Sequence, residues 1–111
     1  MRKLFLVVPV LAILAVLAAS ALAATRSIKV GDNYYVRSRG VPTVTVSKGT
    51  KVKWRFVTNT GHSVTVRRGP TKFNSGIRTG GSYSKTMRKR GTYSIYCVIH
   101  GSEQRMKLVV R

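Results

Sequence analysis

Acidic side chains are nearly absent from this chain. Its 111 residues include only two, Asp32 and Glu103, against 21 lysines and arginines, and the net charge is +19. Catalysis by paired carboxylates needs two acids side by side, and these two lie far apart in the sequence. A surface this positive instead attracts anionic partners and steers their approach.

Cysteine and histidine are almost as scarce. Cys97 is the only cysteine, and His62 and His100 are the only histidines. One cysteine excludes a disulfide within the chain, and it excludes haem attachment, which needs a second cysteine. No Ser–His–Asp set can be assembled either, so we expect a protein that is not an enzyme.

Long hydrophobic runs are absent after the first two dozen residues. Arg2 and Lys3 precede an apolar run, and Ala21-Leu22-Ala23 forms a small-residue cleavage pattern. This layout predicts a secretory signal peptide over residues 1–23 and export to a periplasm, cell envelope or extracellular space. An uncleaved anchor is the alternative, because the apolar run could nearly span a bilayer.

Residues 24–111 remain after cleavage, and they predict one domain. These 88 residues (111 less 23) carry a net charge of +17, which is +19 less the charges of Arg2 and Lys3. An unpaired thiol in an oxidising compartment needs an explanation. Cys97 is either buried and inert, paired with another chain, or bound to a metal, and a metal would also stabilise a small core.

Helical periodicity is also lacking in residues 24–111, and the pattern there is β throughout. The clearest alternation runs over residues 51–57, where Val52, Trp54 and Phe56 share one face. Strands are predicted at residues 28–30, 34–36, 44–46, 51–57, 62–66, 82–87, 92–98 and 106–110. Residues 67–81 are predicted to be a loop, with Phe73 plugging the core. Short strands between turn signals indicate an all-β sandwich or barrel.

The cysteine and the histidines form a pattern typical of a metal site. Two residues separate Cys97 from His100 after a predicted strand, and His62 opens another. Thiolate suits Cu(I), imidazole suits both oxidation states, and a weak axial donor completes a blue-copper site. Structural zinc needs four strong ligands, and only three exist. The alternative is a metal-free β-sandwich with a buried core cysteine.

The sequence resembles the cupredoxin family, of the plastocyanin and azurin type. The matching stretches are residues 32–35, 44–54, 61–66 and 91–100. The resemblance implies a cupredoxin-like Greek-key β-sandwich of about seven to eight strands. It also implies one-electron transfer by one copper ion per chain, which cycles between Cu(I) and Cu(II).

By the same resemblance, His62, Cys97 and His100 are the equatorial copper ligands. His100 would be the most exposed of them and the electron port, within an apolar docking surface formed by Val98, Ile99 and Gly101. Family members often carry asparagine immediately after the first histidine, where it ties the ligand loops together. Ser63 stands there in this chain, and serine has less reach.

The axial ligand has two candidates. The family places a methionine a few residues after the second histidine, and here Gln104 and Met106 both share the inward face of the last strand. Gln104 matches the usual separation from His100 better, so we expect it to be the axial ligand, with Met106 as the alternative. An amide oxygen favours Cu(II) and lowers the reduction potential relative to a thioether.

These features together predict an exported, monomeric type 1 copper protein that carries electrons to an acidic redox partner. Copper storage or delivery is an alternative that would use the same ligands. A metal-free module that binds anionic envelope polymers or lipid head groups is another. Export argues against a specific nucleic-acid target, and the scattered positive charges would also suit a merely solvated surface.

Overall fold

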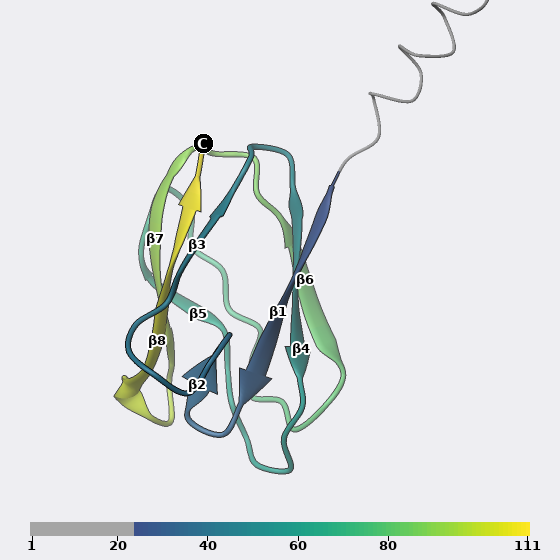
Figure 1. Cartoon of the computed structure of the whole chain (residues 1–111), viewed down its shortest axis with the longest axis vertical. Coiled ribbons are helices and arrows are strands. Elements are labelled where there is room, and N and C mark those ends of the chain that lie inside the picture. The colour runs from purple at the N-terminus through teal and green to yellow at the C-terminus, as the bar shows by residue number, and fades with distance from the viewer. Residues whose placement is uncertain (1–23) are drawn as a thin grey trace, which may run out of the picture.

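The computed structural model describes residues 24–111, which form eight strands and contain no helix (Figure 1). The strands are β1 (Thr25–Gly31), β2 (Tyr34–Tyr35), β3 (Thr43–Val46), β4 (Lys51–Phe56), β5 (Thr65–Arg68), β6 (Ser82–Thr86), β7 (Gly91–Cys97) and β8 (Gly101–Val110). Within this range no helix could cross a membrane. The predicted signal peptide, residues 1–23, lies outside the described residues.

The strands form two four-stranded sheets that face each other. One sheet has the order β2-β1-β4-β6 and the other β3-β8-β7-β5. Neighbours are antiparallel except for two parallel pairs, β1 with β4 and β3 with β8. The prediction of an all-β Greek-key sandwich is therefore confirmed.

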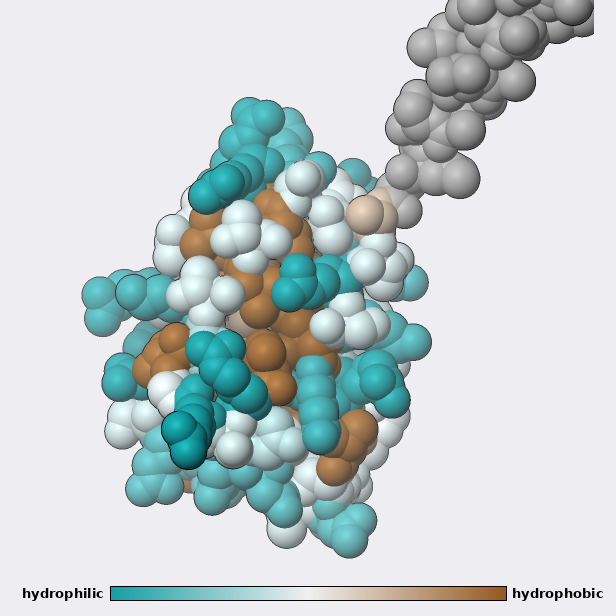
Figure 2. All heavy atoms as spheres, viewed as in Figure 1, coloured by the Kyte–Doolittle hydropathy of each residue, from teal (hydrophilic) through white to brown (hydrophobic). Residues whose placement is uncertain are grey.

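The core fills the space between the sheets and follows the predicted alternation. In β4, Val52 and Trp54 are fully buried, and in β7 Tyr93 and Ile95 are buried. Phe73, the predicted plug, packs against Trp54 at 5.8 Å between ring centroids. Each fully buried large apolar side chain contributes about 1.5–3 kcal/mol through removal from water. Figure 2 shows hydrophobic residues along the middle of one face, with hydrophilic ones around them.

The strand predicted at residues 62–66 was wrong in its position. β5 begins three residues later, at Thr65, and His62 makes only an isolated bridge with Arg78. The reason lies in the following loop, which folds back over this segment. The Val64 N–H donates to Ser75 Oγ at 2.8 Å, and the Ser75 N–H donates to the Val64 carbonyl at 2.9 Å.

A tight turn joins β7 to β8. Cys97 is the register partner of Gly101, so only three residues separate the strands, and His100 is the last of them. Gly101 has a φ of 56°, a left-handed conformation that glycine adopts without strain. The turn lies at the end of the sandwich away from the C-terminus, where the β1–β2 turn and the segment after β4 also lie (Figure 1).

Candidate metal centre

Three side chains from two distant parts of the chain converge at this end of the sandwich. One ligand atom each of His62, Cys97 and His100 lies within 4.8 Å of the others. Cys97 Sγ is 3.4 Å from His100 Nδ1. Cys97 points inward because it continues the buried face of β7, and the tight turn brings His100 back over it. His62 and Cys97 are fully buried, whereas His100 is half-buried.

Gln104 completes the cluster from β8. Its Oε1 lies 2.8 Å from His62 Nδ1 and 3.1 Å from His100 Nδ1. Its Nε2 donates to the carbonyl oxygens of Tyr34 at 3.0 Å and Gly31 at 3.3 Å. The two carbonyls fix the orientation of the amide, because they accept only from its nitrogen. The oxygen must therefore face the histidines.

Met106, the other axial candidate, lies two positions further along β8. Its side chain is 1 % exposed and belongs to the hydrophobic core cluster. Gln104 is the residue of this pair that contacts the histidines. The donor atoms directed at one another are therefore two imidazole Nδ1 atoms, one thiol sulfur and one amide oxygen. That set fits a metal of borderline or soft character such as copper, with imidazole and thiolate as the strong ligands.

The outer nitrogen of His62 has its own polar partners. Nε2 lies 2.9 Å from Thr60 Oγ1 and 3.4 Å from Asp32 Oδ1. Hydrogen bonds from the Thr58 and Thr60 hydroxyls, and then from His62, hold the pKa of Asp32 below its ordinary value. An imidazole that binds a metal through one nitrogen is oriented by the partner of the other. Sequence reasoning missed these partners, because Thr58 and Thr60 lie in the irregular segment after β4 and Asp32 lies in the turn between β1 and β2.

Ser63 links the two ligand segments in spite of its short side chain. Its Oγ accepts from the Val98 N–H at 3.0 Å and lies 2.9 Å from Thr65 Oγ1. The Tyr35 hydroxyl donates to the Ser63 carbonyl at 2.5 Å. Burial raises the pKa of Tyr35 strongly, and the nearby Cys97 adds to this rise, so the hydroxyl stays protonated as a donor. Sequence reasoning did not identify Tyr35 as a support of the site.

Exposed apolar side chains lie beside the candidate metal centre. Val98 and Ile99 of the β7–β8 turn are 43 % and 52 % exposed, and Ile77 is 60 % exposed. A Cβ at Gly61 would meet Ile77 Cγ2 at 2.8 Å and Ile99 Cδ1 at 3.4 Å. The missing side chain at this position therefore lets the two isoleucines gather beside His62. The sequence suggested Val98 and Ile99 for such a surface but not Ile77.

Comparison with known proteins gives a match in structure only. No protein-family model matches the sequence, and no curated protein matches it. The fold is similar to that of an oxidised amicyanin with a proline-to-glycine substitution, with 24 % identity, a TM-score of 0.64, and coverage of 81 % of this chain and 90 % of that one. The fold is also similar to that of a Cu(I) amicyanin that carries a methionine-to-glutamine substitution. The identity is 24 %, the TM-score is 0.66, and the match covers 85 % of this chain and 89 % of that one.

A second Cu(I) amicyanin, which carries a methionine-to-alanine substitution, matches with 23 % identity and a TM-score of 0.65. The match covers 84 % of this chain and 89 % of that one. Amicyanins are cupredoxins, so the chain has the cupredoxin fold that its sequence predicted. Similarity at this level of identity establishes the architecture. The chemistry rests on the side chains of this chain.

Proposed function

We propose that this cupredoxin-fold protein is a type 1 copper protein that carries single electrons. One observation carries the proposal: ligand atoms of His62, Cys97 and His100 lie within 4.8 Å of one another. When bound there, copper supplies a one-electron couple between Cu(II) and Cu(I). A thiolate with two imidazoles is a ligand set that both oxidation states accept.

The protein's own residues hold these ligands in place before any metal arrives. Both histidines would bind as neutral imidazoles through Nδ1. The proton of His62 then sits on Nε2, where Thr60 and Asp32 can accept its hydrogen bond. Because His62 and Cys97 are fully buried, packing limits their movement when the charge of the site changes.

We propose Gln104 as the axial ligand through Oε1. The support is its contact with both histidines and the anchoring of its Nε2 by the Gly31 and Tyr34 carbonyls. Met106 packs in the core instead. An amide oxygen is a harder donor than a thioether, so this choice predicts a lower reduction potential than a methionine site would have.

His100 is the proposed electron port, because it is the most exposed of the three proposed equatorial ligands. Val98, Ile99 and Ile77 around it would exclude water from the contact with a redox partner. The net charge favours an acidic partner, since long-range attraction raises the rate of encounter. Export is proposed from the signal-peptide pattern of residues 1–23.

Electron carriage can be separated from copper storage, which would use the same ligands. A spectroelectrochemical titration should show one electron taken up and released reversibly per copper, and NMR line broadening in mixtures of the two states should reveal rapid self-exchange. Copper that cannot be cycled, or that exchanges electrons only slowly, would favour storage.

A further inference from the structure

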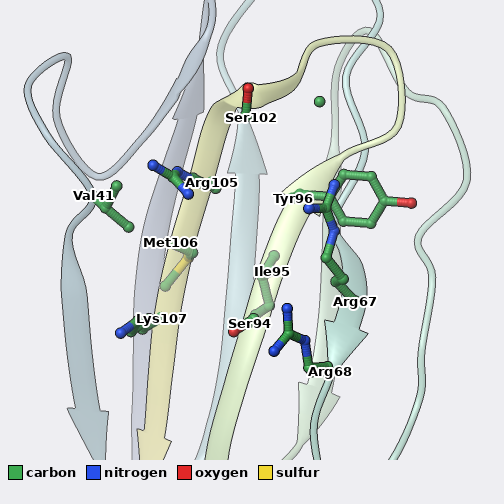
Figure 3. Close-up of a pocket in the computed structure, with 11 residues that line it drawn as sticks. Val41, Arg67, Arg68, Ser94, Ile95, Tyr96, Ser102, Arg105, Met106 and Lys107 are labelled. Carbon is green, nitrogen blue, oxygen red and sulfur yellow. The ribbon is translucent and has the colours of Figure 1, made fainter.

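A cationic pocket lies on the outer face of the β3-β8-β7-β5 sheet, separate from the metal centre (Figure 3). Its volume is about 120 Å³. The residues that line it are Val41, Arg67, Arg68, Ser94, Ile95, Tyr96, Gly101, Ser102, Arg105, Met106 and Lys107. Four of the eleven are positively charged and none is acidic.

The strand register gathers these cations around β7. Ser94 is the partner of Arg68 on one side and of Lys107 on the other. Tyr96 is the partner of Arg105. All four positive side chains are exposed. Cations from β5 and β8 therefore flank the central strand on the same face of the sheet.

A β-bulge brings Arg67 and Arg68 to the pocket together. Successive residues of a regular strand point to opposite faces, so two adjacent arginines would normally diverge. The register of β5 with β7 shifts between Val66 and Arg68, and both arginines line the pocket. Such bulges are frequent where a strand must redirect a side chain toward a functional site.

These charges have no acidic partner. Among residues 24–111, the only carboxylate within 4.0 Å of a basic side chain is Asp32, and its partner is His62. Arg67 lies over the Tyr96 ring at 4.3 Å, visible in Figure 3, and this contact leaves its charge uncompensated. Four like charges around one small hollow repel one another. A bound anion would remove that repulsion.

The size and the donor types restrict the anion. A water molecule occupies about 30 Å³ in the liquid, so the pocket has room for a group of a few heavy atoms. Guanidinium groups are planar forks that match the oxygens of phosphate-like anions, and serine hydroxyls at positions 94 and 102 add uncharged donors. We propose that this pocket binds a small tetrahedral oxyanion with two negative charges, of the phosphate or sulfate class.

The pocket and the metal centre lie on opposite faces of the same strand. Tyr96 lines the pocket, whereas Cys97, the next residue, points into the core. The pocket lining does not include His62, Cys97, His100 or Gln104. Oxyanion binding therefore does not depend on the proposed copper function and can be tested without added copper.

The test is an NMR titration of the purified protein with inorganic phosphate, sulfate and chloride at constant ionic strength. Phosphate and sulfate should cause saturable shifts of amides in residues 94–96 and 101–107, and chloride should not. The double substitution R68Q/K107Q should weaken phosphate binding by about tenfold or more, because charged hydrogen bonds are lost. R105Q alone should weaken it as well.

The matched control is K51Q/R55Q, which removes two exposed charges from β4 in the other sheet. It should bind phosphate as the unsubstituted protein does. Equal losses of phosphate affinity in the pocket and control variants would overturn the proposal, because they would show that only the total charge matters. Phosphate shifts that do not saturate, or that chloride reproduces, would overturn it too. Amide spectra report in the same samples that each variant is folded.

Discussion

At the scale of single residues, three of the four proposed ligands are held at a second atom or by the strand that carries them. Gln104 is anchored by two backbone carbonyls through Nε2, and His62 faces Thr60 and Asp32 through its own Nε2. Cys97 takes its direction from the alternation of β7. The donor atoms are therefore preorganised, which is the condition for a metal site that changes oxidation state without large movement.

Replacement of the two axial candidates separates their roles. Gln104→Met should raise the reduction potential, because a thioether stabilises Cu(I) relative to an amide oxygen. Met106→Leu should leave the potential nearly unchanged and cost less than about 1.5 kcal/mol in unfolding free energy, as expected for a volume-conserving core substitution. Cyclic voltammetry measures the reduction potential of each variant, and urea unfolding measures its unfolding free energy. A larger shift of the potential in Met106→Leu would assign the axial position to Met106.

The charge of Asp32 should also influence the potential. Asp32→Asn removes a negative charge whose oxygen lies 3.4 Å from His62 Nε2, so Cu(II) loses stabilisation and the potential should rise by roughly tens of millivolts. Glu103→Gln is the matched control, because it removes the only other acidic side chain. Voltammetry at low salt should show the larger shift for Asp32→Asn. Equal shifts would mean that the contact with His62 has no particular effect.

At the scale of elements, the site depends on how the β7–β8 turn is tied to the segment of His62. Ser63 provides the tie, since its hydroxyl accepts from the Val98 N–H and its carbonyl accepts from Tyr35. Tyr35 belongs to β2, so one serine connects three segments at this end of the sandwich. The cysteine and the two histidines thereby come from elements that are fixed to one another.

Removal of the Ser63 hydroxyl tests this connection. Ser63→Ala should lower the unfolding free energy of the metal-free protein by about 1–2 kcal/mol, because a buried hydrogen bond is lost. In a domain of this size, 1 kcal/mol corresponds to a melting temperature lower by about 4–8 °C. Ser102→Ala, at an exposed position of β8, is the control and should change little. Circular dichroism measures the melting temperature of each variant. Equal melting temperatures for the two variants would contradict the account.

The elements also show what the sequence could predict. Alternation over residues 51–57 placed Val52, Trp54 and Phe56 on one face because burial between sheets imposes that period. The start of β5 was misplaced because the backbone of Val64 pairs with Ser75, across a loop, and no local pattern signals such a contact.

The proposed ligands were recognisable because their residue types are rare in this chain. The supports of the site were not recognisable, since Asp32 and Tyr35 reach it only when the β1–β2 turn packs beside the other sheet. Their side chains have no local signature of that position. The sheet topology, which brings these segments together, is not written in any short stretch of sequence.

At the scale of the whole molecule, positive charge dominates. The full chain carries +19, and in residues 24–111 its basic side chains find almost no carboxylates. Hydrophilic side chains surround the hydrophobic middle of the face seen in Figure 2. Such a field acts over about 30 Å at 0.01 M salt and about 8 Å at 0.15 M, so its influence on encounter rates should depend on ionic strength.

Small redox reagents of opposite charge measure this field. Reduction of the copper-loaded protein by anionic ferrocyanide should slow as salt rises, because salt screens the attraction. Oxidation or reduction by cationic ruthenium ammine complexes should instead accelerate. Stopped-flow kinetics give, for each reagent, the slope of the rate constant against ionic strength. Slopes of the same sign, or no salt dependence, would mean that the net charge does not govern approach to the electron port.

The measurement that tests the central claim most directly is the visible absorption spectrum during addition of Cu(II) to the purified protein. Ligation of copper by Cys97 with His62 and His100 predicts an intense blue thiolate charge-transfer band that saturates at one copper per chain. The band should be absent in Cys97→Ser, which keeps the histidines and the fold. A protein that stays colourless and retains no copper would contradict the account.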